Sequence, residues 1–396
     1  MANAPEYEID FYSDDAIRAP LPHYAAMRAL GPVVYLPRHE NYALTRNAEI
    51  CDALRDHERF SSASGVAGDA FGCKHLQGNT VASDPPRHGK LRKAMAPPLL
   101  PRALDEIKPN IERSAKALIQ NLVEKETFDT PRDLSRHLPF AIVREMVGLP
   151  DHGQERMLKW AAAAFDVLGC QNERGRAGLD TIQEMRSFIG AEIVPENVRP
   201  GSWTARILDL VAAGELDEAH APFVIRDYIN PSLDTTISAT SQLIWQLSQN
   251  PEAWHLLRDD PSLCRKAVNE AVRLGTPIRS FTRTTTQDVE IGHVTIPAGN
   301  RVMMLFASAN RDERVYPKPD QFDLTRPALR HLGFGLGIHM CVGMHLAQLE
   351  MIALLEAMIP VVERIHCEEP TVVLNNTISA IDRMPTRFDK FRGGRF

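Results

Sequence analysis

Apolar residues recur at intervals of three or four positions along most of the chain, which is the pattern of amphipathic helices. The segments with this spacing are Leu104–Val123, Pro139–Val147, Glu155–Leu168, Ala221–Leu247, Ser262–Leu274 and Met344–Val362. Strand-like runs are short. They are Val33–Leu36, Tyr42–Thr45, Val289–Ile296 (a hairpin turning near Gly292-His293) and Arg301–Phe306. The pattern therefore predicts one mainly α-helical domain, residues 1–396, with small β-sheets at one side.

The composition is that of a globular protein, with 44% hydrophobic and 24% charged residues among 396. A net charge of −6 gives no reason to expect nucleic acid or an anionic membrane as a partner. Six cysteines without a C-x-x-C pair fit a reducing compartment. We expect no signal peptide, because residues 1–8 are acidic, and no apolar run approaches the roughly 18 residues of a membrane span. These features predict a cytoplasmic protein, which we expect to be a monomer.

One cysteine stands in a glycine-rich loop directly before a strongly helical segment. The loop, called the cysteine loop below, runs from Phe334 to Gly343 and contains Cys341. A thiol at a helix N-terminus lies near unpaired N–H groups and the positive end of the helix dipole, which favour the thiolate. Phe334 offers an apolar cover, and Gly337 lets the backbone pass close to a large, flat group. One shielded thiolate is what an iron porphyrin needs as its axial ligand.

The pattern Phe-x-x-Gly-x-x-x-Cys-x-Gly resembles the haem-binding loop of the cytochrome P450 family. One alternative is a buried cysteine beside a helix end. Another is a dinucleotide-binding G-x-G-x-x-G turn, which fails because Met340 replaces the third glycine and no clear strand precedes the loop. The resemblance implies the family's helical prism fold and haem b (iron protoporphyrin IX) bound through Cys341. It places Phe334, Gly335 and Gly343 in the cofactor-binding loop.

Further motifs follow in the order of this family from about Asp84 to the cysteine loop. The sequence Asp84-Pro-Pro is a good helix start, so His88 and Arg92 are expected one turn apart on one helix face. The resemblance implies that this pair binds the haem propionates, together with Arg283 and His339. The alternative is that these residues are ordinary surface charges.

A second group of residues is expected to brace the cysteine loop. Glu270 and Arg273 lie three positions apart and therefore share a helix face. Such a pair is common by chance, but Arg326 follows in the run Phe322–Arg326 shortly before the loop. The resemblance implies a Glu270–Arg273–Arg326 network with a structural role, and it makes Ala309–Glu313 part of the scaffold.

A proline in the long apolar segment marks a third motif. Pro231 should kink the helix and open a groove, with Asp234 and Thr235 within a turn of it. The resemblance makes these two residues the catalytic acid–alcohol pair that delivers protons to dioxygen. Pro231 and Ser232 replace the small residues usual in the family, and Ser232 is a candidate to hold a water. The alternative is an Asp-Thr-Thr cap at a helix start after proline.

The resemblance implies a monooxygenase that inserts one atom of O2 into a small organic substrate by hydroxylation or O-dealkylation. The chain has no flavin or iron–sulfur segment, so electrons are expected from a separate ferredoxin and its reductase. Lys90, Lys93 and Arg330 are candidates for a basic docking patch, unless they are merely solvated. A peroxide-using enzyme and a nitric oxide reductase remain alternatives. A haem gas sensor is a third, although it would not need Asp234 and Thr235.

The expected substrate contacts come from family positions around the haem. They are Phe71–Val81, Ile229, Asn230, Leu233, Ile278, Arg279, Ser280, Phe281 and Ile378–Ala380. Arg279 is a candidate anchor for a substrate carboxylate or phenolate, and the alternative is that it turns to solvent or to a propionate. Parts of the cysteine loop and of Phe281–Thr285 are similar to bacterial members that oxidise small aromatic acids and methoxy-aromatics. An aromatic substrate is therefore expected.

Overall fold

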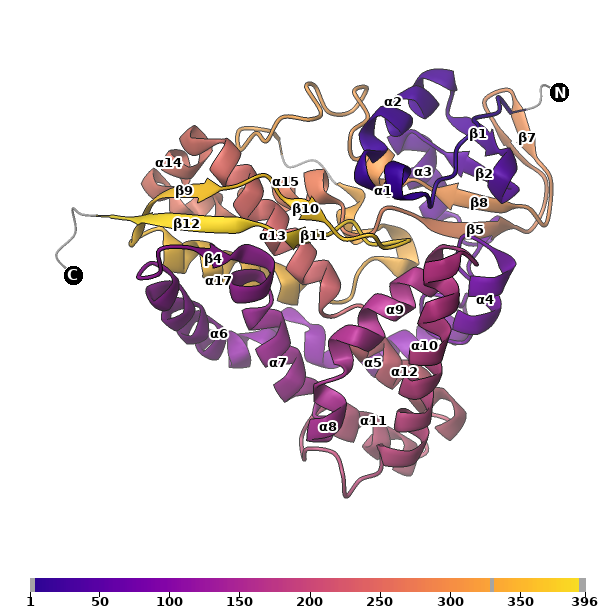
Figure 1. Ribbon diagram of the computed structural model, residues 1–396. Coiled ribbons are helices and arrows are strands. Elements are labelled where there is room, and N and C mark those ends of the chain that lie inside the picture. Colours follow the sequence, from indigo (N-terminus) through magenta and orange to yellow (C-terminus); the bar gives the residue numbers. More distant parts are fainter. Residues whose placement is uncertain (1–3, 328–330, 392–396) are drawn as a thin grey trace.

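The computed structural model describes residues 4–327 and 331–391, and helices dominate it (Figure 1). The α-helices are α1 Asp14–Arg18, α2 Pro20–Leu30, α3 Asn47–Arg55, α4 Ala70–Leu76, α5 Arg87–Met95, α6 Pro101–Leu122, α7 His137–Val147, α8 Asp151–Gln154, α9 Met157–Gly169, α10 Glu173–Glu192, α11 Trp203–Ala212, α12 Ala221–Ile229, α13 Asp234–Gln249, α14 Pro251–Asp259, α15 Cys264–Gly275, α16 Phe306–Ala309 and α17 Met344–Met358. The strands are β1 Val33–Leu36, β2 Asn41–Leu44, β3 Phe60–Ser61, β4 Phe128–Asp129, β5 Phe281–Thr285, β6 Val289–Ile291, β7 Val294–Ile296, β8 Arg301–Met304, β9 Val362–Cys367, β10 Thr371–Val372, β11 Ile381–Arg383 and β12 Pro385–Lys390. The mainly α class with small sheets is thus confirmed.

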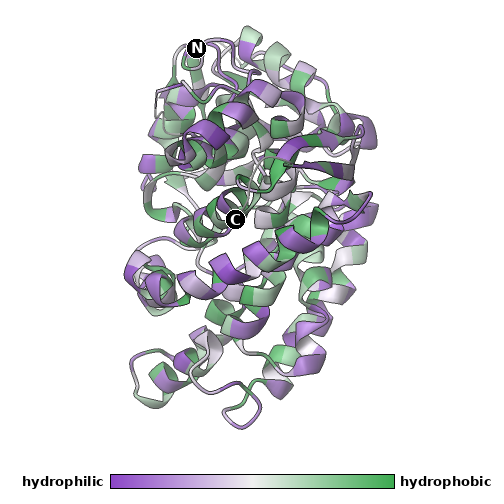
Figure 2. Ribbon diagram, turned by 90° about the vertical axis from the view of Figure 1, so that its left-hand side faces the viewer, coloured by the Kyte–Doolittle hydropathy of each residue, from purple (hydrophilic) through white to green (hydrophobic). Residues whose placement is uncertain are grey.

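The amphipathic segments became helices because each buries an apolar stripe. In α6 the buried residues Leu104, Ile111, Ala115, Leu118, Ile119 and Leu122 recur at helical spacing. Figure 2 shows hydrophilic and hydrophobic residues interleaved along the same helices. The pattern missed α10, where Gly178 allows close packing: a Cβ there would lie 2.9 Å from the Ala163 carbonyl oxygen of α9. Glycine weakens an apolar pattern, so this packing signal was not visible in the sequence.

The sheets join distant parts of the chain. The largest has the order β1-β2-β8-β5-β3, with β2 and β8 parallel, so strands near the N-terminus pair with strands beyond residue 280. The predicted hairpin is confirmed as β6 and β7, which turn at Gly292 with a φ of 61°. The last predicted helix was too long, because α17 ends at Met358 and Val362 begins β9. Strand β9 pairs with β12 in a separate three-stranded sheet.

The predicted long helix over Ala221–Leu247 is two helices, not one kinked helix. Helix α12 ends at Ile229 and α13 begins at Asp234. Pro231 has no N–H to continue the helix. Carbonyls at the break are satisfied by side chains: the Ser232 hydroxyl donates to the Tyr228 carbonyl, and the Thr235 hydroxyl donates to the Pro231 carbonyl at 2.6 Å. Ser232 therefore caps the break through a backbone bond, a contact that the sequence did not predict.

The cysteine loop lies between two apolar cores. One core joins the helices, and Phe334 and Val342 pack against it. The other surrounds the five-stranded sheet, and Leu336 packs against that. The fold thus places the loop at the junction of the two cores. None of the described helices is long and apolar enough to cross a membrane.

Candidate functional site

A cavity lies beside the cysteine loop, and segments far apart in the sequence line it. Its walls include residues of α5, α12, α13 and α17, the cysteine loop, and parts of the segments 76–81 and 277–283. Arg92, Arg283, His339, Cys341 and Thr235 all face it. The structure therefore brings together side chains that the sequence predicted to share one site.

The Cys341 thiol faces this cavity. Atoms of the protein surround the sulfur, and the surface that it exposes opens into the cavity. Burial raises the pKa of the thiol above its usual value, while the amide of Gly343, the charge of Arg92 and the amide of Met344 lower it. The amides at the helix N-terminus thus favour the thiolate as expected, but burial of the thiol outweighs them. The thiolate needs a further positive charge, such as a bound metal ion.

Two glycines set the course of the cysteine loop. Gly335 has a φ of 68° and Gly337 a φ of 73°, which glycine adopts without strain. A Cβ at Gly337 would lie 2.2 Å from the Leu54 carbonyl oxygen, at the end of α3. The close approach at Gly337 is thus to backbone and not to a flat ligand, which corrects the prediction. The Cys341 N–H donates to the Phe334 carbonyl at 2.8 Å and closes the loop.

Four nitrogen-bearing side chains form a cluster beside the cysteine, called the donor cluster below: His88, Arg92, Arg283 and His339. The rings of His88 and His339 lie 4.5 Å apart, and the Nε2 atom of each is buried without a described partner. His88 itself does not line the cavity. Arg92 donates to the Met340 carbonyl, next to Cys341.

Burial controls the charge of the donor cluster. Burial, partly offset by the charge of Asp84, lowers the pKa of Arg283 to about 10. Burial, with the nearby charges of Arg283, His88 and Arg92, lowers the pKa of His339 to about 2. The two arginines are thus cations at neutral pH, and an anion beside them would be stabilised.

These residues fit an iron porphyrin. Cys341 supplies a thiol facing the cavity, and the donor cluster supplies cations and unpartnered ring nitrogens for two carboxylates. Phe334, Val342 and Leu346 give the cavity apolar walls near the cysteine. Iron would be held by Cys341, and the propionates by the donor cluster.

The predicted bracing network forms as expected. The Glu270 carboxylate accepts two bonds from Arg273, each 2.8 Å long, and one from Arg326 at 3.1 Å. Arg273 also donates to the carbonyls of Asn310 and Pro319, both at 2.7 Å. In turn the Asn310 side chain accepts from the Leu332 N–H at 2.7 Å, just before the cysteine loop. The network therefore connects α15 to the start of the loop.

Only one member of the predicted acid–alcohol pair faces the cavity. Thr235 lines the cavity, but Asp234 does not. Burial, together with the nearby Asp166 carboxylate, raises the pKa of Asp234 to about 7. Because Asp234 is the first residue of α13, its side chain leaves the helix in a different direction from that of Thr235. A carboxylate directly beside the groove was therefore a wrong expectation.

Only some of the predicted substrate-contact residues line the cavity. Asn230, Ile278 and Phe281 line the cavity, as do Leu76, Asn79, Thr80 and Val81 from the segment before α5. The residues predicted to contact substrate that do not line it are Phe71–His75, Gln77, Gly78, Ile229, Leu233, Arg279, Ser280 and Ile378–Ala380. Ile229 and Leu233 instead pack fully buried in the helical core. Spacing along the chain could not show which faces of a broken helix meet the cavity.

Arg279 is neither an anchor in the cavity nor exposed to solvent. It is 2% exposed and donates to the carbonyls of Asn375 and Asn376 at 3.0 and 2.7 Å. Its guanidinium also lies 5.6 Å from the centre of the Phe11 ring. Arg279 thus fastens the C-terminal segment to the protein, which corrects its predicted roles.

The sequence reasoning missed two acids that line the cavity, Asp227 on α12 and Glu350 on α17. Each stands among apolar residues of a helix that packs in the core, and this is the signal that could have found them. Lys90 and Lys93 are exposed on α5, the helix of Arg92. The third predicted docking residue, Arg330, lies outside the described residues.

Comparison with known proteins agrees with the geometry. The profile of the family described as Cytochrome P450 matches residues 212–363. The chain is 32% identical to cytochrome P450 CYP199A2 of Rhodopseudomonas palustris, over 97% of this chain and 94% of the relative. It is 29% identical to linalool 8-monooxygenase of Pseudomonas putida, over 95% and 97%. The solved structure of Mycobacterium marinum cytochrome P450 CYP268A2 with pseudoionone superposes with a TM-score of 0.87 at 27% identity, covering 98% of this chain and 100% of that one.

Proposed function

The chain belongs to the cytochrome P450 family and is a haem b-dependent monooxygenase, and from this premise we propose that it oxidises a small organic, aromatic substrate by hydroxylation or O-dealkylation. The apolar and aromatic wall of the cavity supports a substrate of this kind. It includes Phe165, Trp203, Phe281 and Phe306. The 29% identical relative named linalool 8-monooxygenase also acts on a small organic molecule.

The residues on the cysteine side of the cavity are proposed to hold the haem. Haem bound through a cysteine thiolate supplies the chemistry that activates dioxygen. Cys341 is the proposed ligand, because its thiol faces the cavity from a loop that Gly335, Gly337 and the Glu270 network hold in place. The donor cluster is the proposed site for the propionates.

Thr235 is proposed to position a proton donor for dioxygen. Its place in the cavity wall is the observation that carries the proposed reaction. Its side chain faces the cavity at the break between α12 and α13. The hydroxyl donates to the Pro231 carbonyl at 2.6 Å, which holds the oxygen in place to pass protons to dioxygen. Asp234 precedes Thr235 on α13 and is half-buried, and its pKa of about 7 suits a group that both takes up and releases protons near neutral pH.

Electrons come from a redox partner, and a ferredoxin with its reductase is the proposed pair. Lys90 and Lys93 are exposed on α5, and Arg92 of the same helix contacts the Met340 carbonyl beside Cys341. An acidic ferredoxin bound there would be close to the proposed iron ligand.

The proposal is tested with the haem-loaded protein, a ferredoxin, its reductase and a reduced nicotinamide. Small methoxy-aromatics should release formaldehyde and leave the corresponding phenol. The reduced, carbon monoxide-bound protein should show the red-shifted thiolate band, and Cys341→Ser should lose that band while keeping its helix content. Turnover supported equally well by peroxide without ferredoxin would instead favour the peroxygenase alternative.

A further inference from the structure

Asp227 places a carboxylate in the wall of the cavity where a substrate would lie. It comes from α12, the same helix end that supplies Tyr228 and Asn230 to the lining. Cys341 and the three members of the donor cluster that line the cavity, Arg92, Arg283 and His339, come from other elements: the cysteine loop, α5 and β5. Asp227 therefore belongs to the α12 wall and not to the wall assigned to the haem.

The carboxylate of Asp227 keeps free acceptor capacity. Its Oδ2 atom accepts from the Thr80 N–H at 2.9 Å, and no described residue forms an ion pair with it. The guanidinium of the neighbouring Arg226 lies 4.6 Å from the centre of the Phe223 ring, and no ion pair joins it to Asp227 among the described residues. Burial raises the pKa of Asp227 to about 6 against the lowering charges of Arg226 and Arg92, which act from a distance, so the carboxyl is mostly ionised at neutral pH. An ionised carboxylate can accept about four hydrogen bonds. Most of that capacity is therefore left for a group in the cavity.

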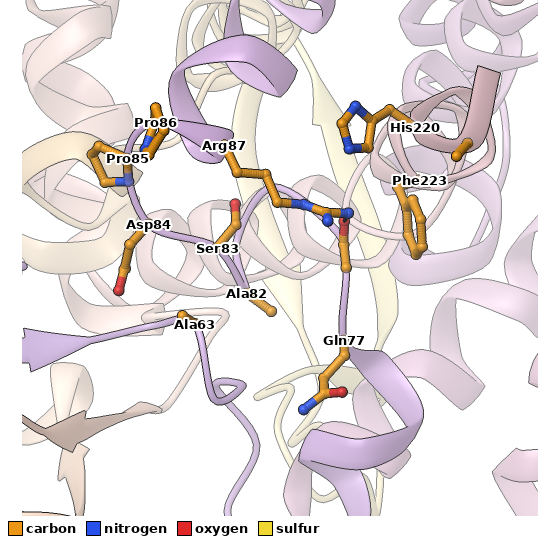
Figure 3. A pocket seen from close by; sticks show the side chains of 12 residues that line it. Ala63, Gln77, Ala82, Ser83, Asp84, Pro85, Pro86, Arg87, His220 and Phe223 are labelled. Carbon is orange, nitrogen blue, oxygen red and sulfur yellow. Dashed lines mark hydrogen bonds between the residues drawn. The ribbon is translucent and has the colours of Figure 1, made fainter. Parts of the chain in front are cut away.

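The segment that carries Thr80 has contacts besides the one with Asp227. The segment that carries Thr80 separates the cavity from a second, outer pocket, where Arg87 donates to the Gly78 carbonyl at 2.8 Å. Figure 3 shows Arg87 reaching from the start of α5 toward Phe223, whose ring centre lies 5.4 Å from the guanidinium. A Cβ at Gly78 would lie 2.3 Å from that ring. The segment is thus held from outside, so a purely structural role for Asp227 is not required.

The cationic side chains of the cavity lining are not available to bind a substrate carboxylate. Among the described lining residues the arginines are Arg92 and Arg283, and both belong to the donor cluster assigned to the propionates. Arg279 is engaged by backbone carbonyls outside the cavity. A substrate carboxylate would thus meet Asp227, a like charge, without a free cation to offset it.

We infer that Asp227 determines specificity, and that this P450 selects substrates with a cationic or neutral N–H or O–H donor over the matching carboxylic acids. The inference rests on the proposed function, since it concerns the substrate of the same site. The bound donor group would hydrogen-bond to the free acceptor positions of Asp227. This wall would reject an aromatic acid, although it would accept the same ring with an amidine or alcohol group.

The test compares three ligands of one shape: 4-methoxybenzamidine, 4-methoxybenzamide and 4-methoxybenzoate. Their dissociation constants for the holoenzyme are measured by equilibrium dialysis, and the low- to high-spin shift of the haem is a second readout. The amidinium should bind at least about tenfold more tightly than the benzoate, with the amide between them. Asp227→Asn should remove that preference, whereas Asp180→Asn, the same change on the exposed face of α10, should leave it intact.

The inference is overturned if the benzoate binds the unmodified protein as tightly as the amidinium does, if the amidinium fails to bind, or if Asp227→Asn leaves the ratio unchanged. The ranking on unmodified protein decides the question should the variant not fold. The carbon monoxide band and formaldehyde release are independent of this ranking. Failure of the specificity and failure of the monooxygenase proposal are therefore distinguishable.

Discussion

The Glu350 carboxyl is buried in the wall of the cavity that Cys341 faces. It is 2% exposed, and its Oε2 atom has no described hydrogen-bond partner. Burial raises its pKa well above the usual value. The folded protein therefore keeps Glu350 protonated at pH values where the unfolded chain has already ionised it. This acid makes unfolding progressively more favourable as pH rises above its ordinary pKa.

Glu350→Gln should consequently raise the melting temperature, and the gain should grow between pH 5 and pH 8. The amide keeps the shape and removes the cost of holding the carboxyl neutral. Thermal unfolding followed by circular dichroism at both pH values measures the difference between variant and parent. An equal difference at the two pH values would show that Glu350 is ionised in the fold.

Thr235→Ala should uncouple electron use from product formation. The hydroxyl faces the cavity and is held by the Pro231 carbonyl, so its loss removes the positioned proton donor without removing the haem ligand. Product formed per reduced nicotinamide should fall severalfold, with more peroxide released. Thr240→Ala removes a buried hydroxyl elsewhere on α13 and outside the cavity lining, and it should not change coupling. Unchanged coupling in Thr235→Ala would contradict the role.

At the scale of elements, the cysteine loop depends on its contact with α3. Gly337→Ala combines a φ of 73° with a Cβ 2.2 Å from the Leu54 carbonyl. It should lower the free energy of unfolding by more than about 2 kcal/mol and weaken haem retention. Gly190→Ala on α10 meets nothing within 4 Å and should stabilise by about 0.5–1 kcal/mol. Denaturant unfolding of both variants provides the comparison, and equal effects would rule out this account of the loop.

The break between α12 and α13 shows where element prediction fails. Apolar spacing continues from Ala221 to Leu247, so the sequence favours one helix. The four residues from Asn230 to Leu233 leave the helix because Pro231 removes a donor and the hydroxyls of Ser232 and Thr235 take up carbonyls. Periodicity reports which residues are apolar, but it does not report how carbonyls at a proline are satisfied.

At the scale of the whole molecule, the sign of the net charge differs from that of the surface proposed to bind ferredoxin. The chain carries −6 overall, yet α5 exposes Lys90 and Lys93 near the cysteine loop. The double variant Lys90→Glu/Lys93→Glu should slow reduction by ferredoxin at least about tenfold at low salt and flatten its dependence on ionic strength. Stopped-flow reduction under carbon monoxide measures the rate.

Its control is Lys74→Glu/Lys159→Glu, which makes the same change in net charge on α4 and α9. This control should reduce at nearly the parent rate. If both double variants slow equally, overall charge and not the α5 surface governs the encounter with ferredoxin.

The sequence by itself determined the cofactor and the family. The cysteine loop is a local motif: its glycines, its thiol and the helix after it are contiguous, so the chemistry could be inferred without the fold. The partners of Glu270 could be predicted for a related reason, because Arg273 shares its helix face and Arg326 belongs to a second recognisable motif. Most long helices were also predictable, since each carries its own apolar stripe.

Only the tertiary structure decided which side chains face the cavity. Arg279 looked like a substrate anchor, but the segment at Asn375 and Asn376 surrounds it. Asp227 was not singled out by the sequence, yet the fold places it in the cavity wall beside Thr80. Side-chain direction depends on elements packed from distant parts of the chain, and neither spacing nor composition records that packing. The sequence thus determined the reaction, whereas the fold decided the charge that a substrate meets.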